Sequence, residues 1–83
     1  MFYIDYKDKD FIVGFRNVDD HDDFKNHCDY LKSKYICFNI FTKQWEVKLN
    51  KIEELILWLE KDKYDFDLSS KALEVFNQYK SVT

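Results

Sequence analysis

The chain of 83 residues has no proline and a single glycine, and this scarcity limits what it can be. Interdomain linkers and phosphate-binding loops depend on these residues, so we expect neither a second domain nor a nucleotide-binding loop. Two cysteines are too few for a disulfide framework, and no apolar run approaches the roughly 20 residues that cross a bilayer. The N-terminus lacks the profile of a signal peptide. We therefore expect one cytoplasmic domain that spans residues 1–83 and does not enter a membrane.

Aromatic side chains are what the chain has in abundance, with eight Phe, six Tyr and two Trp. A chain of this length buries only about 60–65% of its unfolded surface, and large rings let few residues build one core. Little room remains for a deep catalytic cavity, so we expect a binding module. The net charge of −3 argues against strong autonomous binding to nucleic acid.

The hydrophobic pattern predicts an α+β fold, a small antiparallel sheet with helices on one face. A β-β-α-β-β-α unit covers about residues 2–62, and a further helix covers about residues 67–80. The expected elements are, in order, strands 2–6 and 11–15, a helix from the acidic segment 19–23 to about Lys32, a strand beginning at Tyr35, a strand containing Trp45, a helix capped by Asn50, and a helix opening at Asp67 or Ser69.

Two periodicities define the expected core. Alternation in the second hairpin turns one set of side chains toward the helices, namely Ile36, Phe38, Ile40, Trp45, Val47 and Leu49. Helical spacing in the following segment predicts a buried stripe that consists of Ile52, Leu55, Ile56 and Leu59.

The segment from Tyr35 to Leu59 joins a strand, a short Thr-Lys-Gln turn, a strand with Trp45 and an amphipathic helix. This layout resembles the N-terminal accessory domains of superfamily 2 DNA repair and annealing helicases, including those of phage repair helicases and the HARP-type domains. Their hairpin typically reads aromatic-Asp-x-x-x-x-x-Trp; Phe38 and Trp45 keep that spacing, while Asn39 replaces the acid. The resemblance covers roughly residues 10–59. It implies a domain that helps engage branched or single-stranded DNA beside an ATP-hydrolysing motor.

The face of the sheet away from the helices is the expected binding surface. Aromatic rings with interspersed cations can stack bases and contact phosphates there. The residues selected by position are Arg16 of the first hairpin and Lys34, Tyr35, Asn39, Lys43 and Lys48 in and around the second. Tyr35 would stack a base, and the cations would make only about 2–4 phosphate contacts, so binding should be weak. An ordinary half-polar face, or one covered by a motor domain or a second copy, remains the alternative.

The sequence pattern indicates no catalytic site, metal site or cofactor site. The fragment has no G-x-x-x-x-G-K-[ST] segment, so it is not itself a motor or another enzyme. The acids of segment 19–23 are typical of a helix start. The potential zinc ligands His21, His27, Cys28 and Cys37 lack paired spacing.

Two other functions remain open. A small stand-alone protein of the phage type would bind a basic host protein through its acids, which are Asp19, Asp20, Asp22, Asp23, Glu53, Glu54 and Glu60. A structural or oligomerisation module would use an apolar stripe on the third helix around Val75, Phe76 and Tyr79. The many Lys, Asn, Ile, Tyr and Phe residues are typical of AT-rich coding DNA, which favours a bacterial or phage-infected host cell.

Overall fold

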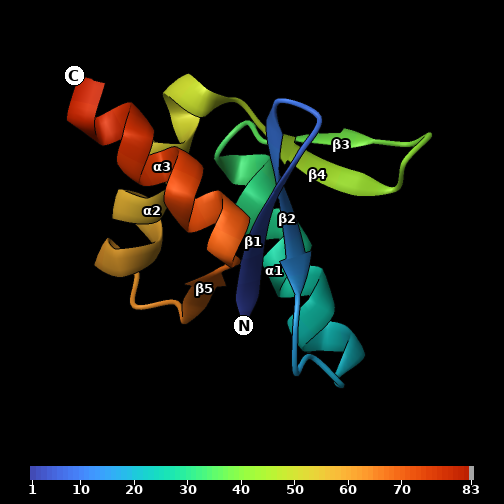
Figure 1. Ribbon diagram of the computed structural model, residues 1–83. Helices are drawn as coiled ribbons and strands as arrows, with labels where there is room; N and C mark the ends of the chain where they lie inside the picture. The colour runs from blue at the N-terminus through green and yellow to red at the C-terminus, as the bar shows by residue number, and fades with distance from the viewer. Residues whose placement is uncertain (83) are drawn as a thin grey trace.

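The structure, a computed structural model, describes residues 1–82 and contains five strands and three helices there (Figure 1). The elements are, in order, β1 (Phe2–Lys7), β2 (Asp10–Phe15), α1 (His21–Ser33), β3 (Cys37–Asn39), β4 (Gln44–Val47), α2 (Leu49–Lys61), β5 (Phe66–Leu68) and α3 (Ser70–Val82). This order confirms the predicted α+β fold class. Within residues 1–82, no helix combines the length and the apolar character needed to span a membrane.

The strands form one sheet in the order β3-β4-β2-β1-β5. All neighbours are antiparallel except β1 and β5, which pair in parallel with Phe2 opposite Phe66. Strand β5 was not predicted, and the predicted helix start at Asp67 is wrong because Asp67 lies within this strand. The strand is nevertheless visible as a period of two, because Tyr64, Phe66 and Leu68 alternate with acids.

Ser69, the second predicted start of the last helix, is confirmed. Its hydroxyl accepts a hydrogen bond from the N–H of Ala72 at 3.1 Å, and α3 begins at the next residue. Helix α3 packs against β1, β5 and α2, and Ala72 is fully buried there. Val75 and Phe76 are half-buried against the core, so they do not present an open apolar stripe.

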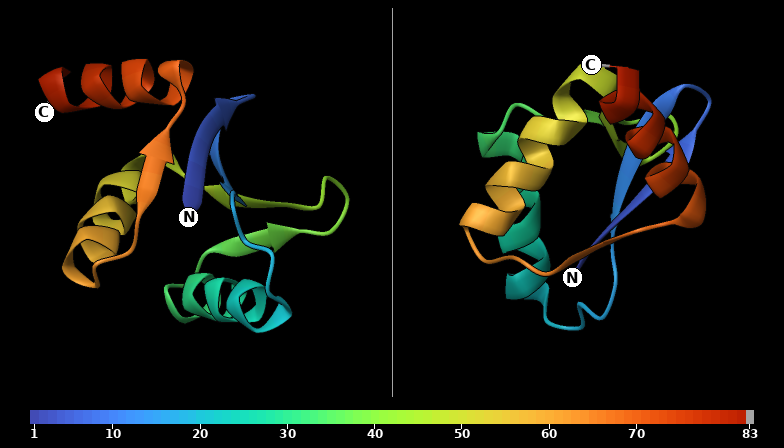
Figure 2. Two further views of the ribbon diagram at one scale, coloured as in Figure 1. Left: turned by 90° about the horizontal axis from the view of Figure 1, so that it is seen from below. Right: turned by 60° about the vertical axis from the view of Figure 1, so that its left-hand side comes forward.

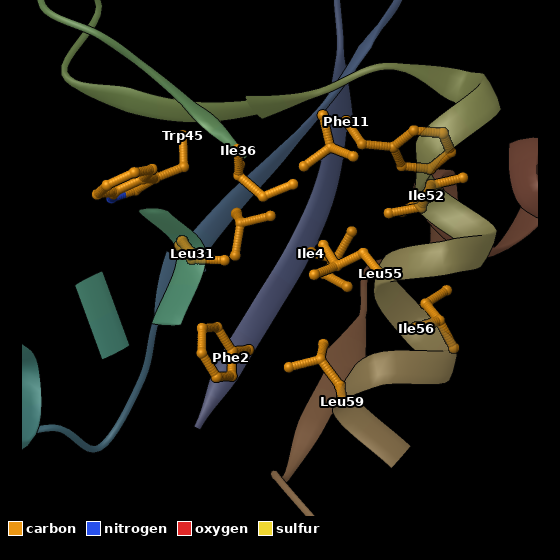
Figure 3. Close-up of a cluster of buried hydrophobic side chains, with 13 residues drawn as sticks. Phe2, Ile4, Phe11, Leu31, Ile36, Trp45, Ile52, Leu55, Ile56 and Leu59 are labelled. Carbon is orange, nitrogen blue, oxygen red and sulfur yellow. The ribbon is translucent and has the colours of Figure 1, made fainter. Parts of the chain in front are cut away.

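One face of the sheet and the helices α1 and α2 enclose the core (Figures 2 and 3). The predicted stripe of α2 is confirmed, because Ile52, Leu55, Ile56 and Leu59 are all buried. Figure 3 shows Ile52, Leu55 and Leu59 extending from α2 toward Phe2, Ile4 and Phe11 of the first hairpin, and Trp45 and Ile36 at the opposite end.

The predicted core position of Ile40 is wrong, because its side chain is 70% exposed. Strand β3 ends one residue earlier, where Asn39 starts the turn to β4. Phe38 is also 44% exposed, although its ring packs against Trp45 at 5.0 Å between centroids. His27, which the pattern did not place in the core, is buried beside the ring of Phe2.

The scarcity of glycine has a structural consequence in the turns and helix ends. Among residues 1–82, six residues with side chains adopt a positive φ, and they are Asp8, Lys9, Asn17, Tyr35, Lys43 and Lys63. A left-handed conformation costs an ordinary residue about 1–2 kcal/mol, which glycine would avoid. The fold therefore retains local strain at these positions.

Candidate nucleic-acid interface

Tyr35 ends helix α1 rather than beginning a strand, so the predicted strand start at this residue is wrong. Its N–H donates to the carbonyl of Lys32 at 3.0 Å, and the N–H of Ile36 donates to the carbonyl of Leu31 at 3.0 Å. These bonds and the φ of 62° at Tyr35 form a Schellman motif, which stops the helix. Ile36 turns into the core, whereas the side chain of Tyr35 is 84% exposed.

Helix α2 begins next to this tyrosine and carries no side-chain cap. Lys48 is the N-cap residue, and Asn50 lies inside the first turn, so the predicted cap at Asn50 is wrong. The first turn holds no acidic residue. Lys48 directly precedes this turn, and Lys51 lies within it. Unpaired N–H groups and the helix dipole make such an end attractive to anions.

Two lysines lie over aromatic rings between α1 and α2. The Nζ of Lys51 lies 5.7 Å from the ring centroid of Tyr35 and 5.8 Å from that of Trp58. The Nζ of Lys34 lies 4.9 Å from the Trp58 centroid and 5.4 Å from that of Tyr30. We call Lys34, Tyr35, Lys48, Lys51 and Trp58 the basic–aromatic surface. Rings and cations alternate across it, which is the arrangement that stacks bases while holding phosphates.

The phenol of Tyr30 anchors one end of this surface. Its hydroxyl donates to the Oδ2 of Asp62 at 2.6 Å, which ties α1 to the end of α2. Burial and the Asp62 carboxylate raise the pKa of Tyr30, so the phenol stays neutral and the hydrogen bond persists through the physiological range.

A shallow cavity of about 230 Å³ lies beside Tyr35, Lys48 and Lys51. Its lining also includes Asp10 and Glu46, whose carboxylates repel anions. An anion in this cavity would therefore be attracted by Lys48 and Lys51 and repelled by the two acids.

The remaining selected residues lie elsewhere. The guanidinium carbon of Arg16 is 3.5 Å from the ring centroid of Tyr3 on the open face of the sheet. Lys43 lines a separate cavity of about 190 Å³ with Tyr3 and Asp5 on that face. The structure thus brings Lys34, Tyr35 and Lys48 to one end of the helices and leaves Arg16 and Lys43 on the sheet.

Asn39 shapes the hairpin turn through the hydrogen bonds of its side chain. Its Oδ1 accepts from the N–H of Phe41 at 2.9 Å and from that of Thr42 at 3.2 Å. Its amide nitrogen donates to the carboxylate of Glu46 at 3.4 Å. An aspartate would accept the same two backbone hydrogen bonds, but it would place a second carboxylate beside that of Glu46.

The open sheet face carries fixed negative charge at Asp5, and this charge opposes phosphate binding. Ser69 donates to the Oδ1 of Asp5 at 2.6 Å. This bond, a second one from the N–H of Tyr6, and the charges of Arg16 and Lys7 lower the pKa of Asp5 despite partial burial. Asp5 is consequently ionised wherever the protein is folded near neutral pH.

His27, Cys28 and Cys37 each occupy a different environment. The Nδ1 of His27 donates to the carbonyl of Asp23 at 2.7 Å within its own helix. Burial raises the pKa of the Cys28 thiol, and Cys37 is exposed on the edge strand. Across residues 1–82, no three His, Cys, Asp or Glu side chains come close enough together to hold a metal ion.

No protein-family model matches this chain, and neither a curated protein nor a solved structure matches it significantly. The resemblance of the hairpin to helicase accessory domains accordingly stays a prediction.

Lys51 and Trp58 are the members of the basic–aromatic surface that the sequence analysis did not select. They lie seven residues apart, which places them on one side of a helix. The spacing of Lys51 and Trp58 within α2 was therefore the sequence signal for this surface. The predicted strand at Tyr35 placed the candidate surface on the sheet face instead of at the helix ends.

Proposed function

We propose that this domain is a non-catalytic module that binds single-stranded nucleic acid through the basic–aromatic surface. The observation that carries the proposal is the exposed ring of Tyr35 beside Lys48 and Lys51, at an uncapped and acid-free helix start. The ring stacks a base, and the cations and the helix N-terminus hold the neighbouring phosphates.

The helicase resemblance supports DNA as the ligand and an accessory role. In this proposal the domain guides single-stranded or branched DNA toward a separate motor, which supplies ATP hydrolysis. A domain with few cations suits that role because the motor provides most of the affinity by tethering.

The expected affinity follows from the number of contacts. Three lysines predict a salt dependence with a slope near −2, given about −0.7 per phosphate on a single strand. Affinity should then fall roughly tenfold or more between about 50 and about 200 mM salt. One stacked base contributes about 1–3 kcal/mol. Binding in the high micromolar range is the expected result.

Fluorescence anisotropy with labelled single-stranded and forked DNA of equal length tests this proposal. The Lys48→Glu/Lys51→Glu variant should weaken binding to both DNAs by about tenfold or more at low salt, because it reverses two charges at the phosphate site. The Lys61→Glu/Lys63→Glu variant is the matched control. It makes the same charge change at the other end of α2 and should alter affinity much less.

Equal losses in the two variants would show that only net charge matters, and the proposed surface would be wrong. No binding by the unmodified domain at low salt would refute autonomous DNA recognition. That result would favour the alternative in which the acidic residues of the chain contact a basic host protein.

A further inference from the structure

The β3–β4 hairpin projects from the body of the domain (Figures 1 and 2). It carries large apolar side chains that contact solvent. Phe41 is 90% exposed, Ile40 70% and Phe38 44%, and Phe24 of the neighbouring helix α1 is 46% exposed. Isolated exposed apolar residues are common, but four at one end of a small domain mark an interaction surface. We call these four residues the hairpin patch.

An apolar hollow lies directly beside these side chains. It has a volume of about 290 Å³ and lies between α1 and the hairpin, where its lining residues are Phe24, Cys28, Lys32, Phe38 and Trp45. The projecting tip and the hollow thus belong to the same surface. A surface with both features is able to complement a second copy of itself.

The backbone of β3 has one free edge, because β3 is the outermost strand and pairs only with β4. The carbonyl of Asn39 accepts from the N–H of Lys43 on the β4 side, at 2.7 Å. Backbone groups of successive strand residues point in opposite directions. The N–H and C=O of Phe38 therefore point toward the free edge, where another strand can pair with them.

We propose that this edge joins two copies of the chain into a dimer, with β3 pairing antiparallel to itself about a two-fold axis at Phe38. In this register the two Phe38 residues exchange two backbone hydrogen bonds. Ile40 of each copy lies opposite Ile36 of the other copy and beside its apolar hollow. The N–H of Ile36 already bonds to Leu31, so the new ladder is short.

The available area sets the strength of this dimer. The exposed parts of three phenylalanines and one isoleucine amount to about 400 Å² on each copy, given ring areas of 150–250 Å². Stable interfaces bury about 800 Å² on each partner, so the dimer belongs to the weak class. We expect a dissociation constant in the high micromolar range. A high local concentration on one DNA or in one assembly would increase the fraction of dimer.

Sedimentation velocity over about 10 µM to about 1 mM protein, with reducing agent present, tests the dimer. The unmodified chain should shift from monomer to dimer over this range. Ile40→Lys should weaken association at least about tenfold, because it places a charge against apolar side chains of the second copy. Leu57→Lys is the matched control, since Leu57 is 58% exposed on α2 and lies outside the hairpin patch. A monomer at every concentration, or equal loss in both variants, would overturn the proposal.

A covalent test reports the register itself and does not depend on affinity. Directly opposed residues in a hydrogen-bonded antiparallel pair have Cα atoms about 5.5 Å apart, within the range of a disulfide. Phe38→Cys in a Cys28→Ala/Cys37→Ser background, which leaves no other thiol, should form a cross-linked dimer on oxidation. Leu57→Cys in the same background should not. Equal cross-linking of the two variants would exclude the proposed axis. The hairpin patch and the basic–aromatic surface consist of different residues. The dimer proposal and the nucleic-acid proposal can therefore each be refuted without affecting the other.

Discussion

Replacing Tyr35 by glycine should stabilise the fold and weaken nucleic-acid binding at the same time. Tyr35 is held at a φ of 62° at the end of α1, a position at which glycine is the usual residue. Tyr35 is 84% exposed, and the ammonium group of Lys51 lies over its ring. The backbone therefore gains from Tyr35→Gly, whereas the proposed stacking surface loses its main ring.

The magnitudes follow from opposing contributions. Removing a side chain from the left-handed region gains about 1–2 kcal/mol, and the greater freedom of unfolded glycine removes about 0.5–1 kcal/mol of that gain. Loss of an exposed cation–π contact removes about 0.5 kcal/mol more. The net increase in the free energy of unfolding is about 0.3 kcal/mol, or roughly 1–2 °C in Tm. Affinity for single-stranded DNA should fall about tenfold.

Urea denaturation and anisotropy on the same samples measure both quantities. Lys63→Gly is the matched control, because Lys63 has a φ of 61° at the equivalent position after α2. It should stabilise by about 1 kcal/mol and leave DNA affinity unchanged. Destabilisation by Tyr35→Gly would show that the ring contributes to folding, and unchanged affinity would refute its role in stacking.

Substitutions at two further positions test the hairpin and the open sheet face. Asn39→Ala should lower the free energy of unfolding by about 1 kcal/mol, because two turn N–H groups lose their acceptor, whereas Asn39→Asp should cost less; chemical denaturation measures both. Asp5→Asn should destabilise the protein at neutral pH. Because folding lowers the pKa of Asp5, its charged form stabilises the folded state above the ordinary value of 3.8, and this contribution disappears as pH falls through the lowered pKa. Denaturation curves across the acidic range should therefore converge, and a constant difference between the two proteins would contradict the assignment.

Much of the fold was predictable because the periodicities are strong. The stripe of α2 from Ile52 to Leu59 and the alternation of β1 and β2 each bury one continuous set of side chains. β5 was missed because it has only three residues, and Leu68 fitted a helical stripe equally well. Local patterns of this length do not distinguish a strand from a helix. Its parallel partner β1 is more than 60 residues away in the chain.

The candidate site was less predictable because it depends on how two helix ends meet. Three selected residues, Lys34, Tyr35 and Lys48, do lie together, but Tyr35 reaches this position through a Schellman motif. The usual marker of that motif is glycine, and a chain with one glycine cannot display the marker at every helix end. The absence of a side-chain cap at the start of α2 was not predictable either, because Asn50 and Glu53 have the spacing of a capping box.

The acidic composition of the chain should matter only at low salt, because the charges are separated along α1. The acids cluster at its N-terminal end and Lys34 follows its C-terminal end; 13 helical residues span about 20 Å between them. The Debye length is about 8 Å at physiological salt but about 30 Å at 0.01 M. Asp19→Asn/Asp22→Asn should therefore raise DNA affinity severalfold at about 0.01 M salt and leave it unchanged near about 0.15 M. Asp20, whose Oδ1 accepts from the N–H of Asp22, remains in place to cap the helix. An equal increase at both salt concentrations would mean that these acids lie against the bound strand, and the DNA would then follow α1 rather than the basic–aromatic surface.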